Sequence, residues 1–88
     1  MKIRPVKILG MLLQEWKHKS CVAHIAEGMG WATIYDVKSK IQGKGHATEL
    51  LLAIQKHYKL LGIELGGSVA LNHKMERLYR KLKIKEYQ

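Results

Sequence analysis

The sequence predicts one small α/β domain, in which helices pack on a mixed sheet that begins with an antiparallel pair of strands. Three observations predict this class. The chain has 88 residues, which is too short for two hydrophobic cores. Apolar residues make up 47% and charged residues 26%, as in an ordinary globular protein rather than a disordered one. Apolar positions recur with helical spacing in some segments and alternate in others, giving the order α-β-β-α-β-α with an optional final strand.

The charge is strongly positive and narrows the classes of partner. Lys and Arg number 16 against 7 Asp and Glu, a net charge of +9. So basic a chain favours nucleic acid, a lipid surface or a phosphate-rich cofactor. The single cysteine, Cys21, excludes an internally disulfide-stapled scaffold. The apolar patch at 8–13 is ended by Gln14, Glu15 and Lys17, so it is too short for the core of a signal peptide. No run approaches the ~18 apolar residues that span a bilayer. A cytoplasmic protein without membrane contact is therefore expected.

Residues 1–20 are predicted to form an N-terminal helix. Leu9, Leu12, Leu13 and Trp16 have the i, i+3, i+4, i+7 spacing of one helical stripe. This helix would pack its apolar stripe on the sheet.

Residues 21–37 are predicted to form a β-hairpin. The segments 21–26 and 31–37 alternate in polarity and are rich in β-branched and aromatic residues. A short glycine-containing linker, 28–30, separates them, as is typical of antiparallel pairs.

The second half of the chain is predicted to alternate helices with strands after a loop at 38–47. A helix is expected at 46–61, a strand at 63–71 and a second helix at 72–82, and 84–88 would begin a last strand. The helices are predicted from apolar residues at helical spacing: Ala47, Leu50, Leu51, Ile54, Tyr58 and Leu61 in the first, and Met75, Leu78, Tyr79 and Leu82 in the second.

The loop at 38–47 is the segment most suited to chemistry. It leads from a strand into a helix, whose first turn leaves about four backbone N–H groups unpaired and carries partial positive charge. Gly43 and Gly45 would let a phosphate approach this backbone closely. Three lysines add positive charge: Lys38, Lys40 and Lys44. The spacing fits neither a P-loop nor a dinucleotide fingerprint, so a solvated surface turn stays open as the alternative.

A wider pattern surrounds this loop. Residues 42–47 read Gln, two residues, Gly, one residue, Ala, with Val37 five positions before the Gln. Asn72 follows the next strand, and the pair Leu78 and Tyr79 follows Asn72. In these motifs and their order, about two thirds of the chain resembles the acetyl-CoA-binding half of the GNAT superfamily of N-acetyltransferases.

The resemblance implies a minimal GNAT-like acyl-CoA N-acyltransferase fold and direct transfer of acetyl from acetyl-CoA, the co-substrate, to an amine. Backbone near Val37 would pair with the pantetheine arm, Gln42 and the N–H groups of 43–47 would hold the pyrophosphate, and Asn72 would contact the arm. Tyr79 would protonate the departing thiolate as general acid. The cofactor-binding residues so implied are Val37, Gln42, Gly43, Lys44, Gly45, His46, Ala47 and Asn72.

The resemblance leaves the other half of the reaction open. The acceptor is an amine on a small molecule or a protein, and the sequence does not identify it. His24 and Glu27 are the two candidates for a general base. No metal site is predicted, because His18, Cys21 and His24 are spaced by three, which places strand side chains on opposite faces.

Two other functions remain as alternatives. The first is a catalytically reduced acetyl-CoA-binding or protein-interaction module, since the family's acceptor side and closing hairpin have little counterpart here. The second is a small nucleic-acid-binding protein using the basic segment 74–85, which lacks the interleaved aromatic residues that would stack bases. The short length and Trp16 are compatible with a homodimer in which one chain completes the other's sheet or cleft.

Overall fold

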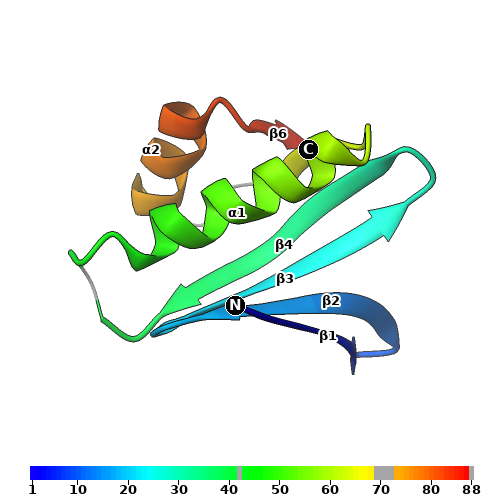
Figure 1. Ribbon diagram of the computed structural model, residues 1–88, viewed down its shortest axis with the longest axis horizontal. Coiled ribbons are helices and arrows are strands. Elements are labelled where there is room, and N and C mark those ends of the chain that lie inside the picture. The colour runs from blue at the N-terminus through cyan, green and yellow to red at the C-terminus, as the bar shows by residue number, and fades with distance from the viewer. Residues whose placement is uncertain (42, 69–72, 88) are drawn as a thin grey trace.

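The computed structural model describes residues 1–41, 43–68 and 73–87 (Figure 1). Within these residues one sheet contains six strands in sequential order. The strands are β1 (Lys2–Ile8), β2 (Met11–His18), β3 (Cys21–Gly28), β4 (Trp31–Ser39), β5 (Glu64–Ser68) and β6 (Lys85–Tyr87), and the helices are α1 (His46–Leu60) and α2 (His73–Leu82).

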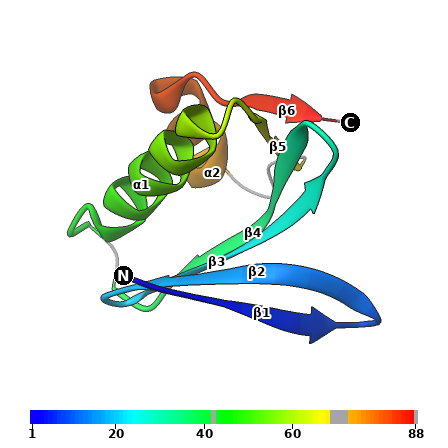
Figure 2. The same ribbon diagram turned by 45° about the vertical axis from the view of Figure 1, so that its right-hand side comes forward.

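The sheet changes direction in the middle. The strands from β1 to β4 form an antiparallel meander, whereas β4, β5 and β6 run parallel. Parallel neighbours need a crossover connection, and α1 and α2 supply the two crossovers. Figures 1 and 2 show both helices on the same side of the sheet, with α2 beside the first half of α1. The predicted mixed sheet with packed helices is thus confirmed.

The helix predicted over residues 1–20 is wrong, because this segment forms the hairpin of β1 and β2. Leu9 and Gly10 make its two-residue turn, with φ values of 51° and 80°. Positive φ at both turn residues matches the twist of the flanking strands. Leu13 is buried and Leu12 is exposed, as expected for neighbours on opposite faces of a strand. A strand that carries apolar residues on both faces can therefore imitate helical spacing.

The remaining predictions correspond closely to the observed elements. The hairpin expected at 21–37 is β3 and β4, and the helix expected at 46–61 is α1, which ends one residue earlier. The strand expected at 63–71 is β5, and its last three positions lie outside the described residues. The helix expected at 72–82 is α2, and the last strand is β6.

The hydrophobic core lies between the sheet and the two helices. Its buried members come from β2, β3 and β4, from the connection between α2 and β6, and from both helices: Trp16, Cys21, Ala23, Ile25, Ala32, Ile34, Leu50, Leu51, Ile54, Tyr58, Tyr79 and Ile84. The α1 residues repeat at helical spacing, so one face of this helix is buried along its whole length. In the described part of the chain, neither helix is long and apolar enough to cross a membrane.

The pairing of β4 with β5 covers only part of β4. Register pairs run from Trp31 to Ile34, whereas β4 continues to Ser39. At the end of this pairing the Ser68 hydroxyl donates a 3.0 Å hydrogen bond to the Tyr35 carbonyl. Beyond Tyr35, the described residues of β5 leave the adjacent edge of β4 unpaired, while β3 still pairs with the other edge. Among the described residues, the pairing of these two parallel strands therefore ends at this point, and we call this end of the pairing the β4–β5 split.

Candidate functional site

An open cavity of about 290 Å³ lies at the N-terminal end of α1. One wall is the loop after β4 together with the first turn of α1, and the opposite wall is α2. The described residues that line it are Ser39, Ile41, Gly43, Gly45, His46, Ala47, Thr48, Lys74, Arg77, Leu78 and Lys81. The glycine loop predicted from the sequence thus faces a second, cationic element.

The loop wall is shaped by two glycines. Gly43 and Gly45 have φ values of 77° and 74°, which is a left-handed conformation that residues with a Cβ atom rarely adopt. Gly45 caps α1 and its carbonyl accepts the Glu49 N–H at 3.0 Å. In the described part of the chain, no side chain forms a capping hydrogen bond at this end of the helix. The N–H groups of the first turn therefore remain available to an anion in the cavity.

Ser20, in the turn between β2 and β3, anchors this wall. Its hydroxyl lies 2.9 Å from Nδ1 of His46, the first residue of α1. Its carbonyl accepts the Lys40 N–H at 3.0 Å. The neighbouring Ser39 hydroxyl donates to the Ile41 carbonyl at 2.8 Å. The sequence analysis missed Ser20, because no local pattern indicates a contact between residues 26 positions apart.

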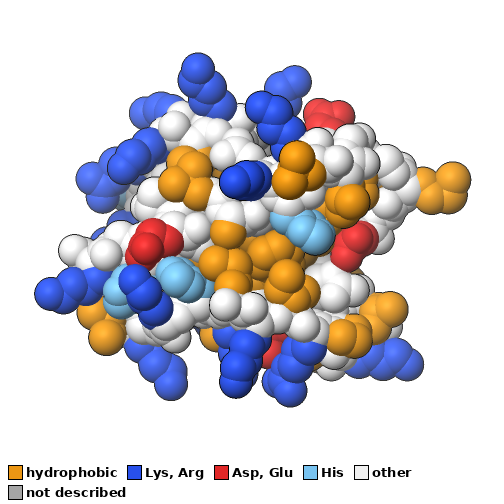
Figure 3. Space-filling view, in the orientation of Figure 1, with side chains coloured by type: hydrophobic (Ala, Val, Ile, Leu, Met, Phe, Trp, Pro, Cys, Tyr) orange, Lys and Arg blue, Asp and Glu red, His pale blue; other side chains and the backbone are white. Residues whose placement is uncertain are grey.

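The α2 wall is a stripe of positive charge, which we call the α2 cationic stripe: Lys74, Arg77 and Lys81. The spacing i, i+3, i+7 places these residues on one helical face. Among the described residues that line the cavity, none is acidic. In Figure 3, Lys and Arg side chains gather at the left and upper left, over the loop and α2. The cavity is therefore suited to anionic groups.

Tyr79 lies inside the core, beside the β4–β5 split. It is 2% exposed and its ring packs over Gly67 of β5. Gly67 pairs with Ile34, the last residue of β4 that pairs with β5. The side chain predicted as general acid is thus held close to the point where the described pairing of β4 with β5 ends.

The structure brings together half of the predicted cofactor residues. Val37 is partly buried against the core farther along β4. Lys44 is exposed and lies outside the cavity lining. Gln42 and Asn72 lie outside the described residues. The predicted residues that line the cavity are Gly43, Gly45, His46 and Ala47.

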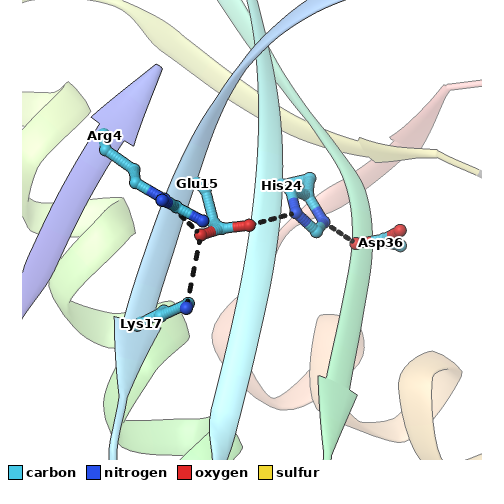
Figure 4. A network of polar contacts seen from close by, with 5 residues as sticks. All are labelled: Arg4, Glu15, Lys17, His24 and Asp36. Carbon is cyan, nitrogen blue, oxygen red and sulfur yellow. Dashed lines mark hydrogen bonds and ion pairs between the residues drawn. The ribbon is translucent and has the colours of Figure 1, made fainter. Parts of the chain in front are cut away.

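A separate polar network links β1, β2, β3 and β4 (Figure 4). Nδ1 of His24 lies 2.6 Å from Oδ1 of Asp36, and Nε2 lies 3.1 Å from Oε2 of Glu15. Glu15 also accepts a 2.9 Å hydrogen bond from Arg4 and lies 3.7 Å from the Lys17 ammonium. His24 is therefore held between two carboxylates.

The network shifts the pKa values of its members. Burial alone would lower the pKa of His24, but its hydrogen bonds to Asp36 and Glu15 raise it above the usual value. The hydrogen bonds from Arg4 and His24 lower the pKa of Glu15. A histidine whose two ring nitrogens are both engaged by carboxylates has no free nitrogen to accept a proton from a substrate. The arrangement therefore disfavours His24 as the general base.

Glu27, the other candidate base, faces Tyr58 near the end of α1 rather than the cavity. Burial raises the pKa of Tyr58 to about 12, and the Glu27 charge adds to the rise. No group of three or more metal-ligating side chains (His, Cys, Asp or Glu) occurs in the described part of the chain.

The chain was compared with protein-family models, with curated proteins and with solved structures, and none of them matches it. The function is therefore inferred below from the geometry of the cavity together with the motif resemblance.

Proposed function

We propose that this protein is an acetyl-CoA-dependent N-acetyltransferase of minimal GNAT-like fold. The observation that carries the proposal is the cavity in which the glycine loop and the first turn of α1 face the α2 cationic stripe. The succession β4, α1, β5, α2, with β4 and β5 parallel, is the order that the motif resemblance implies.

The cofactor would lie along β4, from the cavity to the β4–β5 split. Its pyrophosphate would accept hydrogen bonds from the N–H groups of residues 43–47, where the helix end is positive. The pantetheine arm carries amide groups, which can pair as an added strand does with the edge of β4 near Val37, where no described residue of β5 pairs. Gln42 and Asn72 keep the roles that the resemblance implies.

The thioester would then reach the neighbourhood of Gly67 and Tyr79. A neutral amine attacks the thioester carbonyl, a C–N bond forms, and the C–S bond breaks. The Tyr79 hydroxyl gives its proton to the departing thiolate, and the proton that the new amide nitrogen loses, passed through water, restores the hydroxyl; proton donation by such an acid contributes roughly 10²-fold at the low end. An alkylamine with a pKa of about 10.4 must first lose a proton. That proton would pass to water, because both ring nitrogens of His24 are already engaged by Asp36 and Glu15.

A binding role without catalysis is the second candidate, and the burial of Tyr79 favours it. At 2% exposure and packed over Gly67, this side chain already serves the core. In a protein that binds acetyl-CoA without transferring the acetyl group, this packing role alone would account for Tyr79.

Release of the CoA thiol separates these candidates. Acetyl-CoA is incubated with the protein and, in turn, a polyamine, free lysine and a peptide with a free N-terminus. The proposal expects protein-dependent thiol release with at least one amine, and loss of that release in Gly45→Glu. If the protein binds acetyl-CoA but none of the three amines causes thiol release, the enzymatic function is contradicted and the binding role is supported.

A further inference from the structure

We propose that the α2 cationic stripe is a subsite for the 3′-phosphate of coenzyme A, with Arg77 and Lys81 as its principal residues. This inference rests on the proposed function, because it names which end of the cofactor the second wall of the cavity recognises. The ligand class is a nucleotide that carries a phosphomonoester in addition to a diphosphate.

The cavity offers two different anion-binding surfaces. The loop wall offers backbone N–H groups and the helix end, which suit the diphosphate. The α2 wall offers mobile side-chain cations across the cavity from it. A phosphomonoester carries nearly two negative charges at neutral pH and forms its strongest hydrogen bonds with such cations. Each wall therefore matches one of the two phosphate groups of the cofactor.

Helix stability explains the stripe only in part, since Lys81 lies in the last turn of α2, where the helix dipole favours positive charge. Arg77 and Lys81 are four residues apart on α2, and like charges at this spacing repel. On the same helix, Arg80 donates a 3.1 Å hydrogen bond to Glu76 at the matching spacing. The charge of Arg80 is thus paired with that of Glu76. No described acidic residue lines the cavity beside Arg77 and Lys81. An anionic ligand would relieve this repulsion.

Each of the two walls also contributes an apolar side chain. Ile41 and Leu78 line the same cavity as the cations. Ile41 is half exposed, so a ligand would cover apolar surface there. A nucleoside placed between the two phosphate positions would make this contact, which inorganic phosphate could not.

The test compares CoA with 3′-dephospho-CoA, which differ only in the phosphomonoester. Binding is measured by calorimetry at moderate salt for the wild type, for the Arg77→Gln/Lys81→Gln double variant and for Lys81→Gln alone. Arg80→Gln is the matched control, since it removes the same charge from the same helix away from the cavity. Circular dichroism checks that each variant is folded.

The expected result is a wild-type preference for CoA of about tenfold or more, the size of one charge-assisted hydrogen bond. The double variant should bind both compounds with similar affinity, Lys81→Gln should lie between, and Arg80→Gln should keep the preference.

Three outcomes would overturn the inference. If the wild type binds both compounds equally, the subsite is wrong while the proposed function stands. If the wild type binds neither, both proposals fail. If the stripe variants lose affinity for a mixed-sequence RNA oligonucleotide that binds more tightly than CoA, the stripe belongs to a nucleic-acid surface instead.

Discussion

The ring of Tyr79 lies against the backbone of Gly67: a Cβ atom at position 67 would lie 2.5 Å from Cε2 and Cζ of the ring and 2.8 Å from the hydroxyl oxygen. This contact joins α2 to β5 beside the β4–β5 split. Only glycine leaves room for the tyrosine there, so the sequence pair Gly67 and Tyr79 fixes how closely the helix approaches the sheet.

Substitution of Gly67 by alanine should therefore destabilise the fold. We expect Gly67→Ala to lower the free energy of unfolding by about 1–3 kcal/mol. The added methyl group would overlap the Tyr79 ring, which would have to move out of its packed position. Urea unfolding measures the change. In a Tyr79→Leu background the same substitution should cost much less, because the clashing ring is absent. An equal cost in both backgrounds would show that the ring does not cause the loss.

Removal of the Tyr79 hydroxyl should affect acetyl transfer more than cofactor binding. We expect Tyr79→Phe to slow the transfer by about 10²-fold, as expected for loss of a general acid, and to leave the acetyl-CoA affinity nearly unchanged. Thiol-release kinetics and calorimetry measure the two quantities. A transfer rate equal to that of the wild type would exclude Tyr79 as the acid.

The network around His24 should make stability depend on pH. The hydrogen bonds to Asp36 and Glu15 overcome the effect of burial and raise the pKa of His24 in the folded state. The stability that protonated His24 contributes to the folded state is thus complete below its unfolded pKa of about 6.5, and it is lost as pH rises through the folded pKa. The lowered pKa of Glu15 acts in the opposite sense, so its contribution is present above its unfolded pKa and is lost in acid.

The comparison is between wild type and His24→Gln from about pH 6 to about pH 9. The variant should be less stable by about 1–3 kcal/mol at the acidic end, and the difference should narrow as pH rises. His73→Gln is the control, because the side chain of His73 is 96% exposed. A difference that stays constant or widens with pH would contradict the assigned protonation of His24.

Ser20 should support the phosphate-binding wall from outside the cavity. Its hydroxyl fixes the ring of His46 through Nδ1. Ser20→Ala should weaken acetyl-CoA binding by about fivefold, which corresponds to about 1 kcal/mol for one hydrogen bond. The effect should disappear in a His46→Ala background, as calorimetry of the double variant would reveal. A loss that persists without His46 would point to a general effect on the loop.

The sequence predicted the elements whose pattern is local and unambiguous. Helix α1 was predictable because its buried residues, including Leu50, Ile54 and Tyr58, repeat with one helical period. The hairpin of β1 and β2 was not predictable in this way. Gly10 has the appearance of an interior helix glycine, and only the strand register identifies it as a turn residue with a φ of 80°.

The candidate site was predictable on one side only. Glycines and a helix start mark the loop wall in the sequence itself. The α2 wall depends on the crossover between the parallel strands β5 and β6, which brings residues 74–81 across from residues 43–48. In the sequence, Lys74, Arg77 and Lys81 resemble a solvated helix face, and only the fold places them on a cavity.

An NMR titration with acetyl-CoA tests most directly that this cavity holds the cofactor. Gly45→Glu places a carboxylate at the loop wall, and Gly62→Glu is its matched control, with a similar positive φ of 70° at the far end of α1. We expect saturable amide shifts at residues 43–47 and at Val37 in the wild type and in Gly62→Glu, and none in Gly45→Glu. An absence of saturable shifts in the wild type up to millimolar acetyl-CoA would contradict the account.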